Sequence, residues 1–263
     1  MCKIQYESEI EGKKVNCFAT GFFCEIKDAN IPLKKALFTN NHVLNEKNIE
    51  IGEIIIFEHL KTIKKIEITE KRRVFTNTEL DYTCIEILDS DKINNFFKIE
   101  KTIFENKNSL VNNEIFILQY ASGEELSFYP RKILEIENNT IKHSACTEKG
   151  SSGSPLIKRY KNMFIYGIHF GQEKEIINVF KFNLATSFDA ILRDIKAQLN
   201  NKDKNKIKVN NNKINENLGL LSFKDNIINN DNNIIFDEKI DYRNEINLIY
   251  FSKEEEVKDI FGY

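Results

Sequence analysis

The sequence has no apolar run of signal-peptide length near Met1, and no later segment is long enough to span a membrane. It also has few cysteines. The five cysteines are an odd number among 263 residues, and they lack the paired spacing of a zinc site. These absences favour reduced thiols in a cytoplasmic protein. We therefore expect no membrane partner, no metal and no cofactor.

Charge of one sign is not in excess either. The chain has 38 basic and 40 acidic residues, which give a formal net charge of −2, and the charges are interspersed. A short basic cluster at 71–73 is typical of a solvated turn. Because nucleic-acid-binding proteins carry a basic patch or stripe, we expect no nucleic acid partner.

Short apolar segments rich in isoleucine and phenylalanine recur between polar turns. They are 15–26, 34–39, 53–58, 64–68, 82–88, 114–119, 126–136, 140–143, 155–157, 163–169 and 177–183. Closely spaced strands with little helix between them indicate an antiparallel barrel or sandwich. The polar stretch 89–113 divides the strands into two groups, which suits a connection between two barrels.

One amphipathic helix is expected after these strands, with Ser187 as its N-cap. Its apolar face comprises Phe188, Ile191, Leu192, Ile195 and Leu199. Beyond it, residues 200–233 are rich in asparagine and lysine and predict a flexible linker. Residues 234–263 again alternate apolar and polar residues, which predicts a small β-type appendage whose role the sequence does not reveal.

The segment from Gly150 to Pro155, Gly-Ser-Ser-Gly-Ser-Pro, places a serine between two glycines at the entry to a strand. Ser151 and Ser154 flank the candidate, yet Ser152 alone has a glycine directly after it and another two residues before it. The N–H groups of Gly150 and Ser152 can point at one spot and stabilise an oxyanion. Ser152 is therefore the candidate nucleophile.

A serine nucleophile needs a base and a carboxylate that orients the base. His42 follows an apolar strand and is the candidate base, whereas His59 has no motif around it and is expected at the surface. Asp81 directly precedes a strand and is the candidate carboxylate. Asp89 and Asp91 are rivals, but they lie beyond that strand in a polar turn.

Together these segments resemble the trypsin-like (chymotrypsin-fold) serine peptidases, and more closely the disulfide-free branch that includes the glutamyl endopeptidases. The resemblance covers roughly residues 15–199. It rests on Ala19–Phe23, Thr39–Val43, Asp81, Gly150–Pro155 and Gly167–Gly171.

The resemblance implies an all-β fold of two six-stranded antiparallel β-barrels, followed by a terminal helix that packs on the second barrel. The peptidase domain would span 1–199, with barrel 1 at about 1–95 and barrel 2 at about 110–199. His42 would be the base, Asp81 its orienting partner and Ser152 the nucleophile. The substrate backbone would pair with the strand that carries Phe170 and Gly171.

The residue before the candidate nucleophile bears on whether the protein must be cleaved to become active. In family members made as zymogens, an aspartate at that position pairs with a freed N-terminal amine, and here the position is Ser151. The resemblance therefore implies an oxyanion hole that forms without proteolytic processing.

Two residues bear on specificity. Thr147 and His169 occupy the positions that the glutamyl endopeptidases use to hold an acidic side chain, and both could donate a hydrogen bond to a carboxylate. Two alternatives stay open: a pocket that prefers glutamate, and a pocket of mixed preference that these residues merely line.

The sequence thus predicts a monomeric serine endopeptidase that acts on protein or peptide substrates through an acyl-enzyme. The alternative is a catalytically silent peptidase fold that binds peptides or serves as a scaffold. The complete set of His42, Asp81 and Ser152 favours catalysis, because a scaffold has no physical need for all three.

Overall fold

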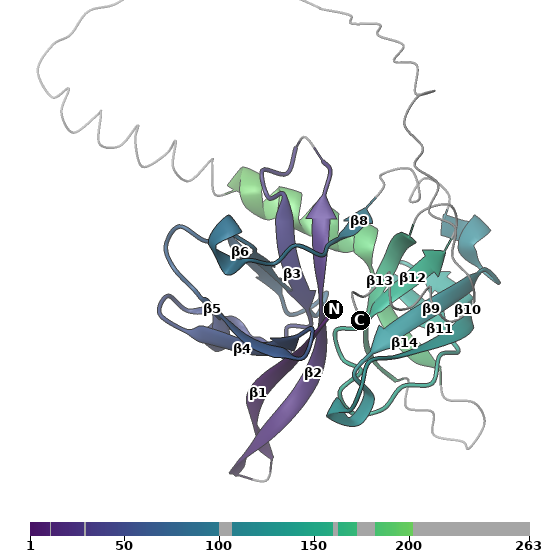
Figure 1. Cartoon of the computed structure of the whole chain (residues 1–263). Helices are drawn as coiled ribbons and strands as arrows, with labels where there is room; N and C mark the ends of the chain where they lie inside the picture. The colour runs from purple at the N-terminus through teal and green to yellow at the C-terminus, as the bar shows by residue number, and fades with distance from the viewer. Residues whose placement is uncertain (11, 29, 100–106, 160–162, 173–181, 202–263) are drawn as a thin grey trace, which may run out of the picture. The chain divides into compact units, whose positions relative to one another are not determined.

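The computed structural model describes residues 1–10, 12–28, 30–99, 107–159, 163–172 and 182–201, all within one compact unit, Met1–Asn201. Nearly all of the predicted linker (200–233) and the whole predicted appendage (234–263) lie outside the described residues. Most of the strand expected at 177–183 does as well. The described residues are mainly β-strands, which form two assemblies (Figure 1).

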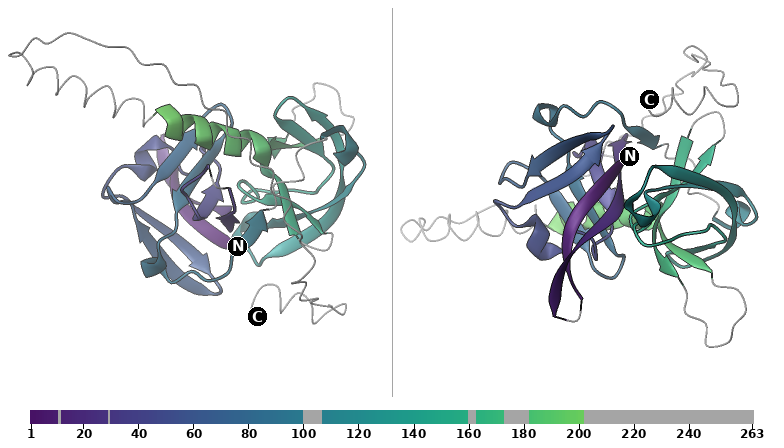
Figure 2. Two further views of the ribbon diagram at one scale, coloured as in Figure 1. Left: turned by 90° about the horizontal axis from the view of Figure 1, so that it is seen from above. Right: turned by 60° about the horizontal axis from the view of Figure 1, so that its bottom comes forward.

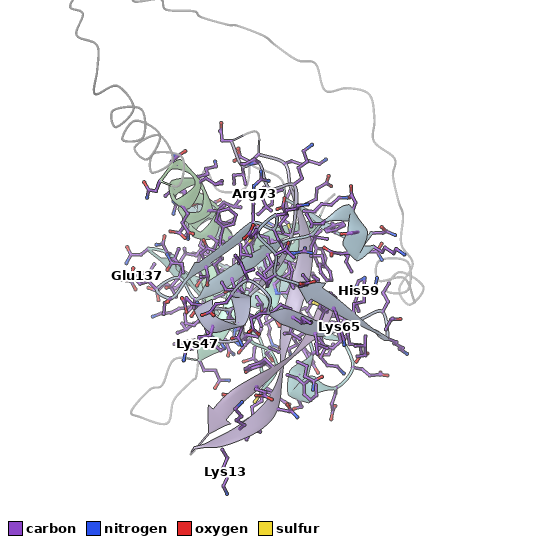
Figure 3. All side chains as sticks on the ribbon, turned by 90° about the vertical axis from the view of Figure 1, so that its left-hand side faces the viewer. Lys13, Lys47, His59, Lys65, Arg73 and Glu137 are labelled. Atoms are coloured by element: carbon purple, nitrogen blue, oxygen red, sulfur yellow. The ribbon has the colours of Figure 1, made fainter. Side chains whose placement is uncertain are left out.

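The first assembly is an eight-stranded sheet. Its strands are β1 (Cys2–Ile10), β2 (Lys13–Ile26), β3 (Lys35–Thr39), β4 (Ile54–His59), β5 (Thr62–Glu67), β6 (Val74–Asn77), β7 (Tyr82–Glu86) and β8 (Phe97–Ile99). Seven strands run in the order β5-β4-β1-β2-β3-β7-β6 through antiparallel pairs, and β8 pairs with β2 in parallel. The β1–β2 hairpin is long, and Lys13 lies at its tip (Figure 3).

The second assembly is a closed six-stranded barrel. Its strands are β9 (Glu114–Gln119), β10 (Ser127–Glu137), β11 (Thr140–His143), β12 (Pro155–Arg159), β13 (Met163–Gln172) and β14 (Asn183–Ser187). They close in the order β10-β11-β14-β13-β12-β9. The predicted double-barrel class is confirmed. The first assembly, however, is an eight-stranded half-barrel, whereas a closed six-stranded barrel was expected.

Strand β2 explains how the first half is packed. Phe23 faces the sheet's own core, with residues such as Ile4 and Leu37. Phe22, its neighbour, points to the opposite face and stacks on Phe38, with ring centroids 5.5 Å apart. A strand that is buried on both faces has a nearly continuous apolar sequence, as β2 does from Ala19 to Cys24.

The helix covers the second face of β2. It occupies the described residues 188–201, and Phe188 packs against Phe38 and Phe22 at centroid distances of 5.0 and 6.1 Å. Figure 2 shows the helix, in green, lying along the first sheet. The expectation that it packs on the second barrel is therefore wrong. The apolar partners it needs, Phe22 and Phe38, are presented by β2 and β3.

The structure also corrects the expectation for His59. This side chain is buried, its Nδ1 lies 2.8 Å from the carbonyl oxygen of Met1, and its ring packs edge-on against Phe23. Pairing of β4 with β1, a strand that the sequence analysis missed, brings His59 inside. No helix within the described segments is long and apolar enough to cross a membrane.

Candidate active site

The candidate nucleophile lies in a tight turn just before β12. Gly150 and Gly153, on either side of the serines, have φ angles of +93° and +84°, which glycine adopts without a steric penalty. A Cβ at Gly153 would lie 2.0 Å from the carbonyl oxygen of Thr20. Glycine is therefore required here by both the turn and the close approach of β2.

Two backbone donors in this turn are left open. The N–H of Ser151 donates to the carbonyl of Glu148 at 3.1 Å, and the N–H of Gly153 donates to that of His169 at 3.0 Å. The N–H groups of Gly150 and Ser152 have no acceptor among the described residues. Such donors can bind an oxygen atom that develops negative charge.

The structure brings His42 and Asp81 together. His42 follows β3, Asp81 precedes β7, and these strands pair. The Nδ1 atom of His42 lies 2.7 Å from Oδ2 of Asp81, and the backbone N–H of His42 donates to Oδ1 at 3.0 Å. The carboxylate therefore orients the imidazole by both its ring and its backbone.

The backbone at Asp81 is also held in place. Asp81 has a φ of +45°, in the left-handed region, where a residue other than glycine is uncommon. Its carbonyl oxygen accepts a hydrogen bond from Nδ2 of Asn40 at 2.8 Å, and the carbonyl of Leu80 accepts one from the Thr186 hydroxyl at 2.8 Å. Asn40 of the first assembly and Thr186 of the second therefore hold the backbone that carries the carboxylate.

The rival carboxylates are engaged elsewhere. Asp91 forms a buried, bidentate ion pair with Arg72, at 2.8 and 3.0 Å. Asp89 pairs with Lys35 at 3.2 Å. Neither is placed to orient His42.

Hydrogen bonds of the Thr20 backbone connect the turn that carries Ser152 to the strand that precedes His42. The N–H of Thr20 donates to the carbonyl of Ser152 at 2.9 Å, and the carbonyl of Thr20 accepts the hydroxyl of Thr39, three residues before His42. Within the described part of the chain, the Ser152 hydroxyl makes no hydrogen bond to the His42 ring. In unliganded active sites such a bond is often long and tightens when substrate binds.

Thr147 and His169 lie in one hydrogen-bonded region of the second barrel. The hydroxyl of Thr147 donates to Oδ1 of Asn183 at 2.5 Å and accepts from Nε2 of Gln172 at 3.3 Å. The amide of Asn183 in turn donates to the carbonyl of Ala145. No motif in the sequence marks the role of Asn183, and Gln172 was expected only at the end of the strand edge that pairs with the substrate.

His169 is buried, and its Nδ1 lies 3.3 Å from Nε2 of His143. Since the N–H of Ala145 donates to Nδ1 of His143, the proton of His143 is on Nε2 and is donated to His169. Neutral His169 then carries its own proton on Nε2.

Burial keeps both rings neutral. Burial lowers the pKa of His169 to about 4; the nearby Leu184 carbonyl opposes this shift, and a positive charge on His42 would add to it. Burial, with a further contribution from His169, lowers the pKa of His143 to about 3. His143 was not predicted as a site residue. The only signal in the sequence was its position at the end of a predicted strand.

Ser151, where zymogens of the resembled family carry an aspartate, is fully buried. Its hydroxyl accepts the N–H of Glu148 at 3.0 Å, while its own N–H donates back to the carbonyl of Glu148. A neutral side chain thus closes the 148–151 turn with bonds local to it. No cluster of potential metal ligands occurs in the described segments.

Residues 19–165 match the family model of the trypsin-like peptidase domain, which is more than half of the chain. The chain belongs to the trypsin-like peptidase family. No curated protein matches it in sequence.

Two solved structures have a similar fold. A serine endoprotease from Yersinia pestis is 13% identical, with a TM-score of 0.51, and the match covers 73% of this chain and 60% of that one. An inactive serine-to-alanine mutant of Rv3671c from M. tuberculosis is 14% identical, with a TM-score of 0.50, and the match covers 74% and 86%. The chain thus spans about 60% of the length of the Yersinia protein.

Proposed function

We propose that this trypsin-like protein is a serine endopeptidase that cleaves peptide bonds through an acyl-enzyme. The Ser152 hydroxyl oxygen attacks the scissile carbonyl, and His42 takes the hydroxyl proton and passes it to the leaving amine. Water then attacks the ester with His42 again as base, releasing the acid and restoring Ser152. Asp81 keeps the imidazole in the required tautomer.

The contact of 2.7 Å between His42 Nδ1 and Asp81 Oδ2 carries this proposal. A carboxylate at Nδ1 places the ring proton there and leaves Nε2 as the free base. The side chain of His42 is 43% exposed, so a substrate can reach it. The open N–H groups of Gly150 and Ser152 supply the oxyanion donors.

Strand β13 offers a place for the substrate backbone. Its pairing with β12 begins at Ile168, opposite Pro155, whereas Gly171 and Gln172 still pair with β14. The segment from Phe170 to Gln172 therefore extends past the end of β12. A substrate strand could add to that side, as peptides add to exposed sheet edges in other proteins.

A fluorophosphonate probe tests the catalytic assignment. Attack by Ser152 forms an O–P bond, the P–F bond breaks, fluoride leaves, and His42 accepts the hydroxyl proton. Ser152→Ala should abolish both labelling and peptide hydrolysis. Ser154→Ala is the matched control, because the buried Ser154 hydroxyl has no hydrogen-bond partner among the described residues. Full activity in Ser152→Ala would end the proposal.

Preference for glutamate at the primary specificity position is the finer proposal. The exposed amide of Gln172 is a donor near the expected pocket, and the Thr147 hydroxyl would become one if a substrate carboxylate replaced Asn183 as its acceptor. The burial and the neutral state of His169 favour the alternative of mixed preference. Profiling on a peptide library decides between them: cleavage after glutamate that is lost in Thr147→Val and His169→Ala supports the first, and cleavage after Lys, Arg or large apolar residues rejects it.

A catalytically silent peptide-binding module is the second candidate function. The observation in its favour is that Ser152 and His42 are not hydrogen-bonded to each other. This alternative would be established if the folded wild-type protein bound peptides but was neither labelled by the probe nor able to hydrolyse a peptide.

A further inference from the structure

Thr20, on β2 of the first half, is fully buried and uses all its polar atoms at the nucleophile turn and its surroundings. Its hydroxyl donates to the carbonyl of Gly150 at 2.8 Å and accepts the N–H of Tyr120 at 3.0 Å. Its N–H donates to the carbonyl of Ser152, and its carbonyl accepts the Thr39 hydroxyl. One residue thus connects the nucleophile turn to both halves of the unit.

The carbonyl groups of four successive residues in the turn are all held. Ser122 N–H donates to the carbonyl of Lys149 at 2.5 Å, and Ser154 N–H donates to that of Ser151 at 3.0 Å. Thr20 holds the other two, those of Gly150 and Ser152, through its hydroxyl and its N–H.

This pattern fixes the direction of the two open N–H groups. In a trans peptide the C=O and the following N–H point in opposite directions. A held Lys149 carbonyl therefore turns the Gly150 N–H outward, and a held Ser151 carbonyl does the same for the Ser152 N–H. The intervening peptide, from Gly150 to Ser151, links the two donors. Its orientation is set by two hydrogen bonds, from the Thr20 hydroxyl to its carbonyl and from its own N–H to the Glu148 carbonyl.

We propose that the Thr20 hydroxyl is a positioning group for the oxyanion hole. The inference rests on the proposed function and adds to it a residue on the far side of the barrel interface. Without this hydroxyl, the Gly150 carbonyl and the Tyr120 N–H lose their shared partner. Among the described residues the Gly150–Ser151 peptide then keeps a single hydrogen bond, from the Ser151 N–H to the Glu148 carbonyl. It can tilt about that bond and carry the Ser152 N–H out of alignment, since glycine at 150 offers little resistance.

The test compares two variants of Thr20 with a control in the same half. Thr20→Val keeps the shape and removes the hydroxyl, whereas Thr20→Ser keeps the hydroxyl. Thr83→Val is the control, because Thr83 is equally buried and its hydroxyl bonds the carbonyl of Leu44, away from the turn. Folding of each variant is checked by circular dichroism before any rate is compared.

The readouts are the fluorophosphonate labelling rate, kcat and KM on a library-derived peptide, and amide hydrogen exchange of the 148–155 segment. Thr20→Val should lower kcat and the labelling rate about 10²- to 10³-fold, the loss typical of one oxyanion donor, with KM changed less than about threefold. Exchange in 148–155 should accelerate. Thr20→Ser should recover most of the rate, and Thr83→Val should keep wild-type rates.

Wild-type labelling and wild-type exchange in a folded Thr20→Val would overturn the inference. So would equal losses in Thr20→Val and Thr83→Val, because they would indicate general destabilisation. A wild-type protein that is never labelled would instead defeat the proposed function, and the exchange measurement would still decide whether Thr20 holds the turn.

Discussion

At the scale of single residues, the site depends on backbone conformations that few residue types adopt. Asp81 keeps a φ of +45° because Asn40 and the turn around Thr78 hold its carbonyl and its N–H. Asparagine tolerates this region better than most residues, so an amide can replace the carboxylate without disturbing the turn.

Asp81→Asn should therefore lower kcat by about 10⁴-fold with little loss of stability. The amide would present its N–H₂ to the ring and favour the wrong imidazole tautomer. Steady-state kinetics and a urea titration measure the two effects. Asp89→Asn, which removes a surface partner of Lys35, serves as the control. Unchanged turnover in Asp81→Asn would remove Asp81 from the site.

Gly153→Ala should destabilise the protein by more than about 2 kcal/mol, because the new methyl group would collide with the Thr20 carbonyl and the Thr39 hydroxyl at an unfavourable φ. Gly171→Ala offers a matched control, since nothing lies within 4 Å of a Cβ there. Urea unfolding of both variants measures the difference. Equal stability of the two would contradict the packing described for the turn.

At the scale of elements, the helix connects the barrel that precedes it to the sheet it covers. It follows β14, yet its apolar face rests on Phe22 and Phe38 of the first sheet. The hydroxyl of Tyr82, directly after Asp81, donates to Oδ2 of Asp194 on the helix at 2.6 Å. Burial and this contact raise the pKa of Tyr82. The helix thus supports the strand next to Asp81, the candidate carboxylate.

Phe188→Ala should cost about 3 to 5 kcal/mol in unfolding free energy, because it removes a fully buried ring from the contact with Phe22 and Phe38. Leu192→Ala, at a half-buried position on the same helix, should cost clearly less. Chemical denaturation of both variants tests the comparison. If Leu192→Ala were the more damaging change, the central role of Phe188 in seating the helix would be contradicted.

At the scale of the described unit, buried neutral histidines make stability depend on pH. His143 and His169 have folded-state pKa values of about 3 and about 4, whereas an unfolded histidine titrates near pH 6.5. Between these values the unfolded chain binds more protons than the folded one. The stabilisation that comes from keeping these two rings neutral is therefore fully present above about pH 6.5, and it is lost as the pH falls towards 4.

The unfolding free energy should accordingly fall between pH 7 and pH 4.5, with about 1.4 kcal/mol at stake for each unit of pKa difference. Burial also lowers the pKa of His59, which adds to the same trend. Urea titrations across this range measure the loss, and NMR of the ring protons assigns it. Ring resonances of His143 or His169 that titrate near pH 6.5 in the folded protein would contradict the buried, neutral pair.

Local patterns in the sequence were enough to predict most of the strands, the class of fold and the candidate residues His42, Asp81 and Ser152, although strands β1, β6 and β8 were not predicted. Strand periodicity, glycine at left-handed positions and a serine between glycines are properties of neighbouring residues. Short-range chemistry sets them, so they are visible before the chain folds.

Contacts between distant residues were decided by the tertiary structure. Thr20 and Gly150 lie 130 positions apart, and no spacing in the sequence links a threonine on a strand to the turn that carries Ser152. The seating of the helix on Phe22 and Phe38, the burial of His59 under β1 and the His143–His169 pair have the same origin. Each depends on which apolar faces and unpaired polar groups meet once the strands pair, and that pairing is a property of the whole unit.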